Sequence, residues 1–157
     1  MEMNELVQQD AVVAALKAGS KKQVLQELST RAAKLTGLHE RQIFDVLLER
    51  ERLGTTGVGR GIAIPHGKLK ELAQLQGLFA KLEKPIDFDA IDDEPVDLIF
   101  LLLAPESAGA DHLKALAKVS RLLRDETMCA KLRNSEDADA IYALLVEPPA
   151  GSASSAA

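Results

Sequence analysis

The stretch Leu98-Ile99-Phe100-Leu101-Leu102-Leu103-Ala104 is an unbroken apolar run, and Pro105 follows it directly. A short run without polar alternation is typical of a strand that is covered on both of its faces. We therefore expect a central strand in a sheet that has helices packed against it, which is an α/β architecture. The run is far shorter than the roughly 20 residues that cross a bilayer, so it predicts no membrane span.

Helices and strands are predicted on both sides of this run. Ser20 and Gln23 form the capping box of a helix that Gly37 ends, and a second helix stops at Gly54. Asp111 is the predicted cap of the first helix after the run, and Ser135 or Asp137 opens the last one. The helices are expected at 20–36, 39–53, 112–124, 127–133 and about 137–146, and the other strands at 62–64 and 77–83.

The composition limits the classes of function. The chain has 157 residues, 19 Lys and Arg against 24 Asp and Glu, three His and one Cys. A net charge of −5 argues against a nucleic-acid-binding domain, and one cysteine excludes a disulfide framework or a cysteine metal cluster. The first five residues lack the pattern of a signal peptide, so we expect a cytoplasmic protein that does not insert into membranes. We expect one domain over residues 1–147 and a disordered tail over 148–157.

A glycine-rich segment leads to the first candidate site residue. Four glycines occur among residues 54–61, and the short predicted strand after them ends in Pro65-His66-Gly67. Pro65 restricts the backbone on both sides, so the position of His66 is stiffly set. Gly67 leaves the imidazole accessible. A turn in which His66 is incidental is the alternative interpretation.

Two further polar side chains fall on the apolar faces of predicted helices. Positions i, i+4 and i+7 share a helix face, which places His112 with Leu116 and Arg50 with Leu47. His112 also lies in a first helical turn, where free amides favour an anion. Each residue alone has a structural explanation, since a core histidine and an arginine that snorkels to solvent are both common.

Together the three residues favour phosphoryl chemistry. A neutral imidazole can attack phosphorus, and the resulting N–P bond is labile enough to pass the group on. His112 would supply a second donor and Arg50 a positive charge, with amides of residues 54–61 adding to them. A Walker A loop is excluded because Leu69 follows Gly67-Lys68 where Ser or Thr is required. A zinc site lacks a short-spaced pair of ligands, so no metal or other cofactor is predicted.

Residues 50–68, RERLGTTGVGRGIAIPHGK, resemble the signature of enzyme IIA proteins of the fructose/mannitol type. These proteins belong to the phosphoenolpyruvate-dependent phosphotransferase system, and the form of residues 61–68 is most similar to the nitrogen-regulatory branch. The resemblance extends over residues 6–145. Thr55 and Val58 stand where the family commonly has Ser and Ile. Further support comes from residues 85–92, 95–100 and 112–113.

The resemblance implies a mixed, mainly parallel sheet flanked by helices, and a role for each candidate residue. His66 matches the histidine phosphorylated by a carrier of the HPr or NPr type, and we expect the tele form, with phosphorus on Nε2. His112 matches the residue that stabilises the phosphoryl group, and Arg50 matches the active-site arginine. Thr56, Gly57 and Gly67 are the expected binding residues.

Two alternatives stay open beside this phosphoryl carrier with a regulatory output. One is a sugar-specific enzyme IIA that passes the group to a separate IIB domain, and the other is a binding module whose histidines are structural. The segment 87–97 holds six acidic residues and no basic one. It is either a solvated loop or a surface that steers a basic partner such as the carrier.

Overall fold

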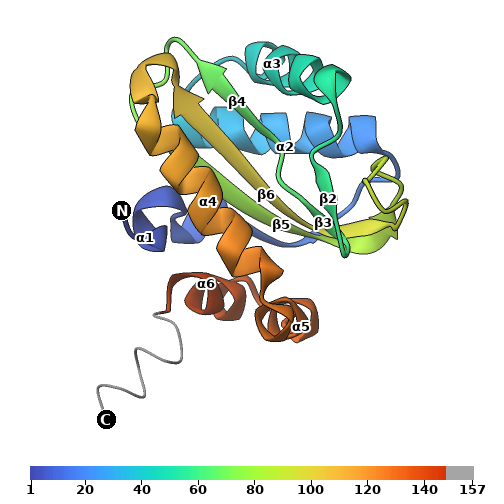
Figure 1. Cartoon of the computed structure of the whole chain (residues 1–157). Helices are drawn as coiled ribbons and strands as arrows, with labels where there is room; N and C mark the ends of the chain where they lie inside the picture. Colours follow the sequence, from blue (N-terminus) through green and yellow to red (C-terminus); the bar gives the residue numbers. More distant parts are fainter. Residues whose placement is uncertain (148–157) are drawn as a thin grey trace.

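The apolar run lies in β6 (Val96–Pro105), which is central in the sheet as predicted. In the computed structural model, which describes residues 1–147, β6 pairs with β5 (Gln76–Ile86) on one side and with β3 (Ile62–Ala63) and β4 (His66–Leu69) on the other. The strand order is β1-β5-β6-β3-β2, with β4 paired to β6 (Figure 1). The strands at the two ends of this order are β1 (Val12–Leu16) and β2 (Gly57–Gly59).

The sheet is mixed and mainly parallel, which confirms the predicted fold class. The β1·β5, β3·β6 and β4·β6 pairs are parallel, whereas β5·β6 and β2·β3 are antiparallel. One face packs against α2 (Lys21–Thr36) and α3 (Glu40–Leu53). The other packs against α4 (Ala110–Arg124), α5 (Glu126–Asn134) and α6 (Ala138–Val146), and Figure 1 shows α4 crossing in front of the sheet. The first elements are the short helix α1 (Met3–Leu6) and a 3₁₀ turn at Gln9–Ala11, and a second 3₁₀ turn, Glu106–Ala108, precedes α4.

The side chains of β6 alternate between two apolar layers. Leu98, Phe100 and Leu102 are buried against the α4 side, whereas Ile99, Leu101 and Leu103 are buried against α2 and α3. All six are 0% exposed. The absence of polar alternation in this run is therefore explained by two cores that meet at one strand.

The helix boundaries agree with the predicted ones except at the start of α4. Ser20 Oγ accepts a hydrogen bond from the Gln23 amide at 3.2 Å, and Gly37 ends α2 in the left-handed region with φ 77°. The prediction that Asp111 caps α4 is wrong. The helix begins two residues earlier than predicted, at Ala110, because Gly109 adopts a φ of 54° at the N-cap position and turns the chain into the helix.

The strands β3 and β4 are two parts of one interrupted strand. Ile62 lies opposite Leu98 and His66 opposite Leu102, so the register along β6 is the same on both sides of the interruption. At the interruption, the Ile64 amide donates to Thr56 O at 3.0 Å, and Pro65 has no amide hydrogen to donate. Sequence patterns predicted a strand at 62–64 but not β1, β2 or β4, because the three to five residues of each of these strands show too little periodicity to recognise.

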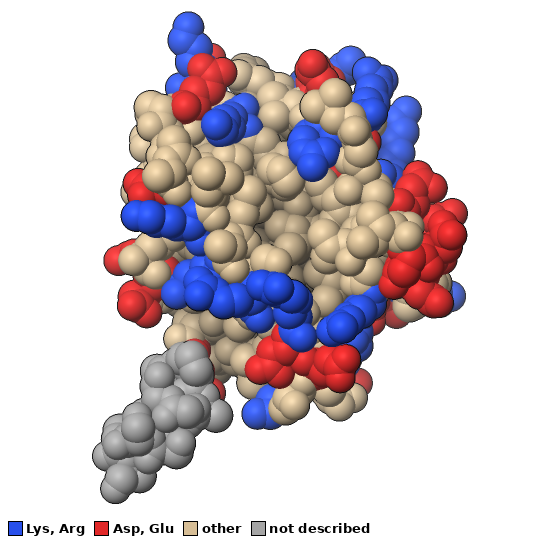
Figure 2. Space-filling view, in the orientation of Figure 1, with Lys and Arg blue, Asp and Glu red and all other residues tan. Residues whose placement is uncertain are grey.

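The acidic residues of the β5–β6 loop gather at one edge of the face seen in Figure 2. Asp92 in this loop and Asp97 at the start of β6 have structural partners. Asp92 accepts from the Arg60 amide at 2.9 Å, and Asp97 forms a bidentate ion pair with Arg133.

Within residues 1–147, no helix has the length and apolarity that a membrane crossing requires. The predicted tail at 148–157 lies outside the described residues.

Candidate functional site

His66 is the first residue of β4, the strand that pairs with β6 beyond the end of β3. His66 pairs with Leu102 of β6, and the next residue, Gly67, pairs with Leu103. Since neighbouring strand residues alternate, Gly67 faces the opposite side of the sheet from His66. A Cβ on Gly67 would lie only 2.5 Å from Val46 Cγ1, so glycine allows α3 to pack closely on β4. The predicted role of Gly67 was to leave His66 accessible. The structure gives it this different, packing role.

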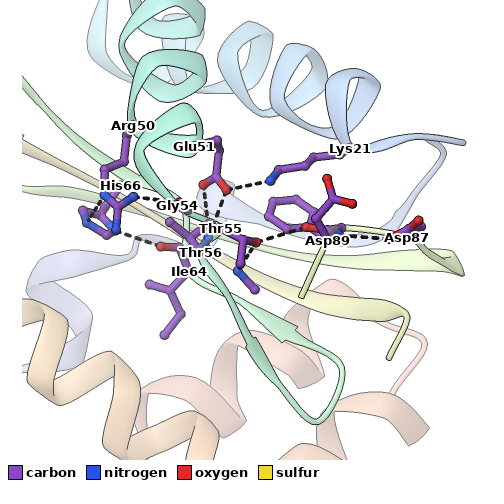
Figure 3. Close-up of polar contacts among 12 residues, drawn as sticks. Lys21, Arg50, Glu51, Gly54, Thr55, Thr56, Ile64, His66, Asp87 and Asp89 are labelled. Carbon is purple, nitrogen blue, oxygen red and sulfur yellow. Dashed lines mark hydrogen bonds and ion pairs between the residues drawn. The ribbon is translucent and has the colours of Figure 1, made fainter. Parts of the chain in front are cut away.

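Both ring nitrogens of His66 have defined neighbours. Nδ1 lies 2.9 Å from Ile64 O, and the Nε group of Arg50 lies 3.3 Å from Nε2 (Figure 3). A carbonyl oxygen only accepts, so the first contact requires the proton to be on Nδ1. The guanidinium Nε–H only donates, so the second contact requires a lone pair on Nε2. The two contacts therefore specify the same tautomer, in which Nε2 is the free nucleophilic nitrogen.

Arg50 comes from the last turn of α3 and is half-buried, as its position on the apolar face predicted. Its Nη1 group donates to Gly54 O at 2.8 Å, which closes the end of the helix. This second hydrogen bond holds the guanidinium plane beside His66. A positive charge is thus placed next to Nε2, where a phosphoryl group would bring negative charge.

His112 reaches the site from the opposite layer. It lies in the first turn of α4, is 6% exposed, and its ring centre is 5.8 Å from that of His66 with the rings at 69°. Its Nε2 is buried and has no hydrogen-bond partner among the described residues. Burial lowers the pKa of His112, and repulsion from a protonated His66 and from the Lys68 ammonium would lower it further. The site therefore contains a neutral imidazole with one unused polar nitrogen.

Thr56 and Gly57 lie next to the site but face other parts of the protein. The amide of Thr56 donates to Glu51 Oε1 at 2.9 Å, and its hydroxyl donates to Glu51 Oε2. A Cβ on Gly57 would lie 2.9 Å from Cα of Ala90, so this glycine permits a close backbone approach. Binding of a phosphoryl group by Thr56, Gly57 and Gly67 stays a prediction.

Glu51 is the residue at this site that sequence reasoning missed. Its side chain is 3% exposed and contacts Lys21 Nζ at 3.0 Å in addition to Thr56. The signal in the sequence was its position four residues after Leu47, which continues the apolar face of α3.

Among the described residues, no group of three or more His, Cys, Asp or Glu is placed to hold a metal ion.

The chain matches the model of a known protein family over most of its length. The family model for the phosphoenolpyruvate-dependent sugar phosphotransferase system, EIIA 2, matches residues 5–147, and the chain belongs to this family. The resemblance found in the sequence is thereby confirmed.

Several individual members of the family are similar to this chain. The chain is 61% identical over 153 residues to a nitrogen regulatory protein of Bradyrhizobium diazoefficiens, covering 98% of this chain and 100% of that protein. It is similar to the crystal structure of the nitrogen regulatory protein IIA-Ntr from Neisseria meningitidis, with a TM-score of 0.87, 34% identity, and coverage of 91% and 98% of the two chains. A mannitol enzyme IIA from Escherichia coli, solved in complex with phosphorylated enzyme IIB, has a TM-score of 0.73 over 87% of this chain and 94% of that one. Its identity of 21% shows a shared fold alone.

Proposed function

We propose that this protein is a phosphoryl carrier of the nitrogen-regulatory phosphotransferase branch. It accepts a phosphoryl group on Nε2 of His66 from the phosphohistidine of an HPr- or NPr-type carrier protein. The observation that supports this most is the pair of contacts at His66, with Nδ1 at 2.9 Å from Ile64 O and Nε2 facing Arg50. These contacts present Nε2 as the nucleophile and fix the direction of its lone pair.

The proposed step is an in-line transfer between two imidazoles. The Nε2 lone pair of His66 forms a bond to phosphorus while the N–P bond of the carrier breaks. The electron pair of that bond returns to the nitrogen of the carrier's histidine. The proton on Nδ1 of His66 stays in its hydrogen bond to Ile64 O, which holds the more positive ring after transfer. The transfer requires no metal or nucleotide.

Arg50 and His112 stabilise the transferred group from its two sides. Arg50 moves its Nε–H hydrogen bond from the nitrogen lone pair to a phosphoryl oxygen, which adds a charge-assisted contact as the anion arrives. The buried Nε2 of His112 gains the partner that it lacks among residues 1–147. A neutral His112 serves as a donor in its Nε2–H tautomer, and the arriving negative charge raises its lowered pKa.

The output of this branch is regulatory. A phosphoryl group adds negative charge and three acceptor oxygens to a surface that partner proteins contact, so partners distinguish the two states of the protein. The match to a nitrogen regulatory protein at 61% identity over its whole length supports this branch. The carrier and enzyme I are expected to meet the protein in the cytoplasm.

A sugar-specific enzyme IIA is the second candidate function. The mannitol enzyme IIA that shares this fold was solved with phosphorylated IIB, so transfer to a IIB domain is chemically accessible to the same fold. A binding module with structural histidines is the third candidate. Complementation of sugar uptake would favour the second, and absence of any phosphorylation would favour the third.

The test is phosphorylation in a mixture of phosphoenolpyruvate, enzyme I and either an HPr-type or an NPr-type carrier. We expect one acid-labile phosphoryl group in the wild type and none in His66→Ala. His39→Asn is the matched control, because His39 is an exposed histidine at the start of α3. An acid-labile group that persists in His66→Ala would contradict the assignment of the acceptor.

A further inference from the structure

Glu51 is a buried carboxylate beside the site whose interactions all lead to one loop. Removing a carboxylate from water costs several kcal/mol unless charge and hydrogen bonds compensate. Lys21 supplies the charge, and the amide and hydroxyl of Thr56 supply two hydrogen bonds, one to each carboxylate oxygen. The Lys21 ammonium is itself held over the Phe88 ring at 4.7 Å. The carboxylate is thus fixed in position, and it fixes Thr56 in turn.

The backbone connects Thr56 to His66 through two further hydrogen bonds. Thr56 O accepts from the Ile64 amide at 3.0 Å, and Ile64 O accepts from Nδ1 of His66 at 2.9 Å. The three residues thus form a short chain of hydrogen bonds that runs from Glu51 to the imidazole, as Figure 3 shows for its side chains. This chain runs along the interruption between β3 and β4, where Ile64 donates to Thr56 O and Pro65 O accepts from the Leu102 amide of β6 at 2.9 Å.

Glu51 also fixes the second neighbour of the imidazole. It follows Arg50 directly in the last turn of α3, and the segment that it holds includes the backbone next to Gly54, the acceptor of the Arg50 Nη1 group. A movement of the 54–56 segment relative to α3 would displace Arg50 and Ile64 O together. One carboxylate therefore sets both the donor that faces Nε2 and the acceptor that faces Nδ1.

We infer that Glu51 is a positioning residue that sets the tautomer of His66, acting through Thr56 and Ile64. This inference rests on the proposed phosphoryl transfer to His66 and names the group that keeps its nucleophilic nitrogen free of a proton. Groups that orient metal-binding imidazoles from outside typically change activity by about 10- to 100-fold when they are removed, and we expect an effect at the lower end of that range here. A merely structural ion pair between Lys21 and Glu51 would affect stability without affecting the tautomer.

The test combines nitrogen NMR of the histidine ring with transfer kinetics on the intact chain. Glu51→Gln keeps the shape but loses the charge and one acceptor oxygen. Thr56→Val removes the hydroxyl and keeps the backbone, and Thr56→Ser restores the hydroxyl as the conservative variant. Glu49→Gln is the matched control, since Glu49 is exposed on the same helix. Chemical denaturation of each variant measures any loss of stability separately.

We expect wild-type His66 to carry its proton on Nδ1 in the unphosphorylated protein. Glu51→Gln and Thr56→Val should shift part of the population to the Nε2–H tautomer and slow transfer by about tenfold, whereas Thr56→Ser and Glu49→Gln should resemble the wild type. A wild-type proton on Nε2, or an unchanged tautomer in both Glu51→Gln and Thr56→Val, would overturn the inference. Because the tautomer is measured without a carrier, a failure of phosphorylation in the wild type would instead contradict the proposed function.

Discussion

The β2–β3 hairpin is held by charged side chains at both ends, at the turn around Arg60 and at the open end formed by Thr56 and Ile64. The two ends differ in whether nearby polar atoms are left without a hydrogen-bond partner. At the turn, Arg133 makes an ion pair with Asp97 at 2.9 Å and donates to Arg60 O at 2.9 Å. Asp92 accepts from the Arg60 amide, so the left-handed turn at Arg60, with φ 59°, has partners on both sides. At the open end, Glu51 holds Thr56, which leads to Ile64 and His66.

The two ends differ in the polar atoms that stay available for a ligand after these hydrogen bonds are made. The turn end joins donors and acceptors that satisfy each other, which is the arrangement expected of a group that stabilises a fold. The open end directs its hydrogen bonds so that Nε2 of His66 keeps a lone pair toward Arg50. Within residues 1–147 the neighbouring Nε2 of His112 has no hydrogen-bond partner. Buried polar atoms are rarely left without partners, and we propose that the partner of this one is a phosphoryl group that arrives during function.

Replacement of Arg50, at the open end, should cause the largest loss of phosphoryl-transfer rate. Arg50→Lys keeps the charge but loses the Nε–H group that faces His66, and we expect transfer from the phosphorylated carrier to slow about 100-fold. Rapid-quench measurement of the transfer rate tests this, with Arg52→Lys as the control in the same helical turn, because Arg52 is exposed. A rate for Arg50→Lys within twofold of the wild type would show that Arg50 does not act on the phosphoryl group.

Replacement of Arg133, at the turn end, should lower the stability of the protein and leave the transfer rate unchanged. Arg133→Met removes the ion pair and the hydrogen bond to Arg60, and its partial exposure limits the loss in the free energy of unfolding to about 1 kcal/mol. The transfer rate should not change. Urea unfolding measures the loss, and Arg124→Met, at an exposed position of α4, is the control. A tenfold slower transfer without loss of stability would contradict the division between the two ends.

Removing charge from the acidic β5–β6 loop, beside the turn end, should have a smaller effect on the transfer rate. Asp93 and Glu94 are exposed, and Asp93 has a φ of 60°, which asparagine tolerates well. If the loop steers a basic carrier, Asp93→Asn with Glu94→Gln should slow transfer about twofold at low salt and have no effect at high salt. The control carries the same change in charge elsewhere, in Glu27→Gln with Glu136→Gln. Equal rates for the two double variants at low salt would remove the steering role.

The pH dependence of stability should reveal the neutral His112 at the open end. Its pKa is lowered in the folded protein, so below the unfolded value of about 6.5 the unfolded chain binds more protons than the folded one. Stability from this group is therefore complete above that pH and is lost as the pH falls toward the folded pKa. Thermal unfolding between pH 8 and pH 5 should show a smaller acid loss for His112→Gln than for the wild type. Parallel curves for the two proteins would contradict a buried neutral imidazole.

Much of this arrangement follows from periodicity alone. The unbroken run in β6 predicted a central strand, and the spacing along α3 and α4 placed Arg50 and His112 on buried faces. These inferences succeed because an apolar face is a local property of a helix or strand, and its spacing is visible in one sequence. Membership of the enzyme IIA family then follows from residues 50–68 and is confirmed by the match over residues 5–147.

The remaining features depend on contacts between segments that are distant in the sequence. Lys21 and Glu51 are 30 positions apart, and no local pattern pairs them. Gly67 is required by Val46 of another element, which a sequence read in order does not reveal. The cap of α4 was misassigned to Asp111 for a related reason. Asp111 is a common N-cap residue type, but the backbone turn at Gly109 determines where the helix begins.

The most direct test of the account is the site of the N–P bond in the phosphorylated protein. Phosphorus and nitrogen NMR on protein with ¹⁵N-labelled histidine, after reaction with phosphoenolpyruvate, enzyme I and the carrier, identifies both the residue and the ring nitrogen. We expect a single phosphohistidine with phosphorus on Nε2 of His66 and the proton retained on Nδ1 toward Ile64 O. Phosphorus on Nδ1 of His66, or on His112, would contradict it.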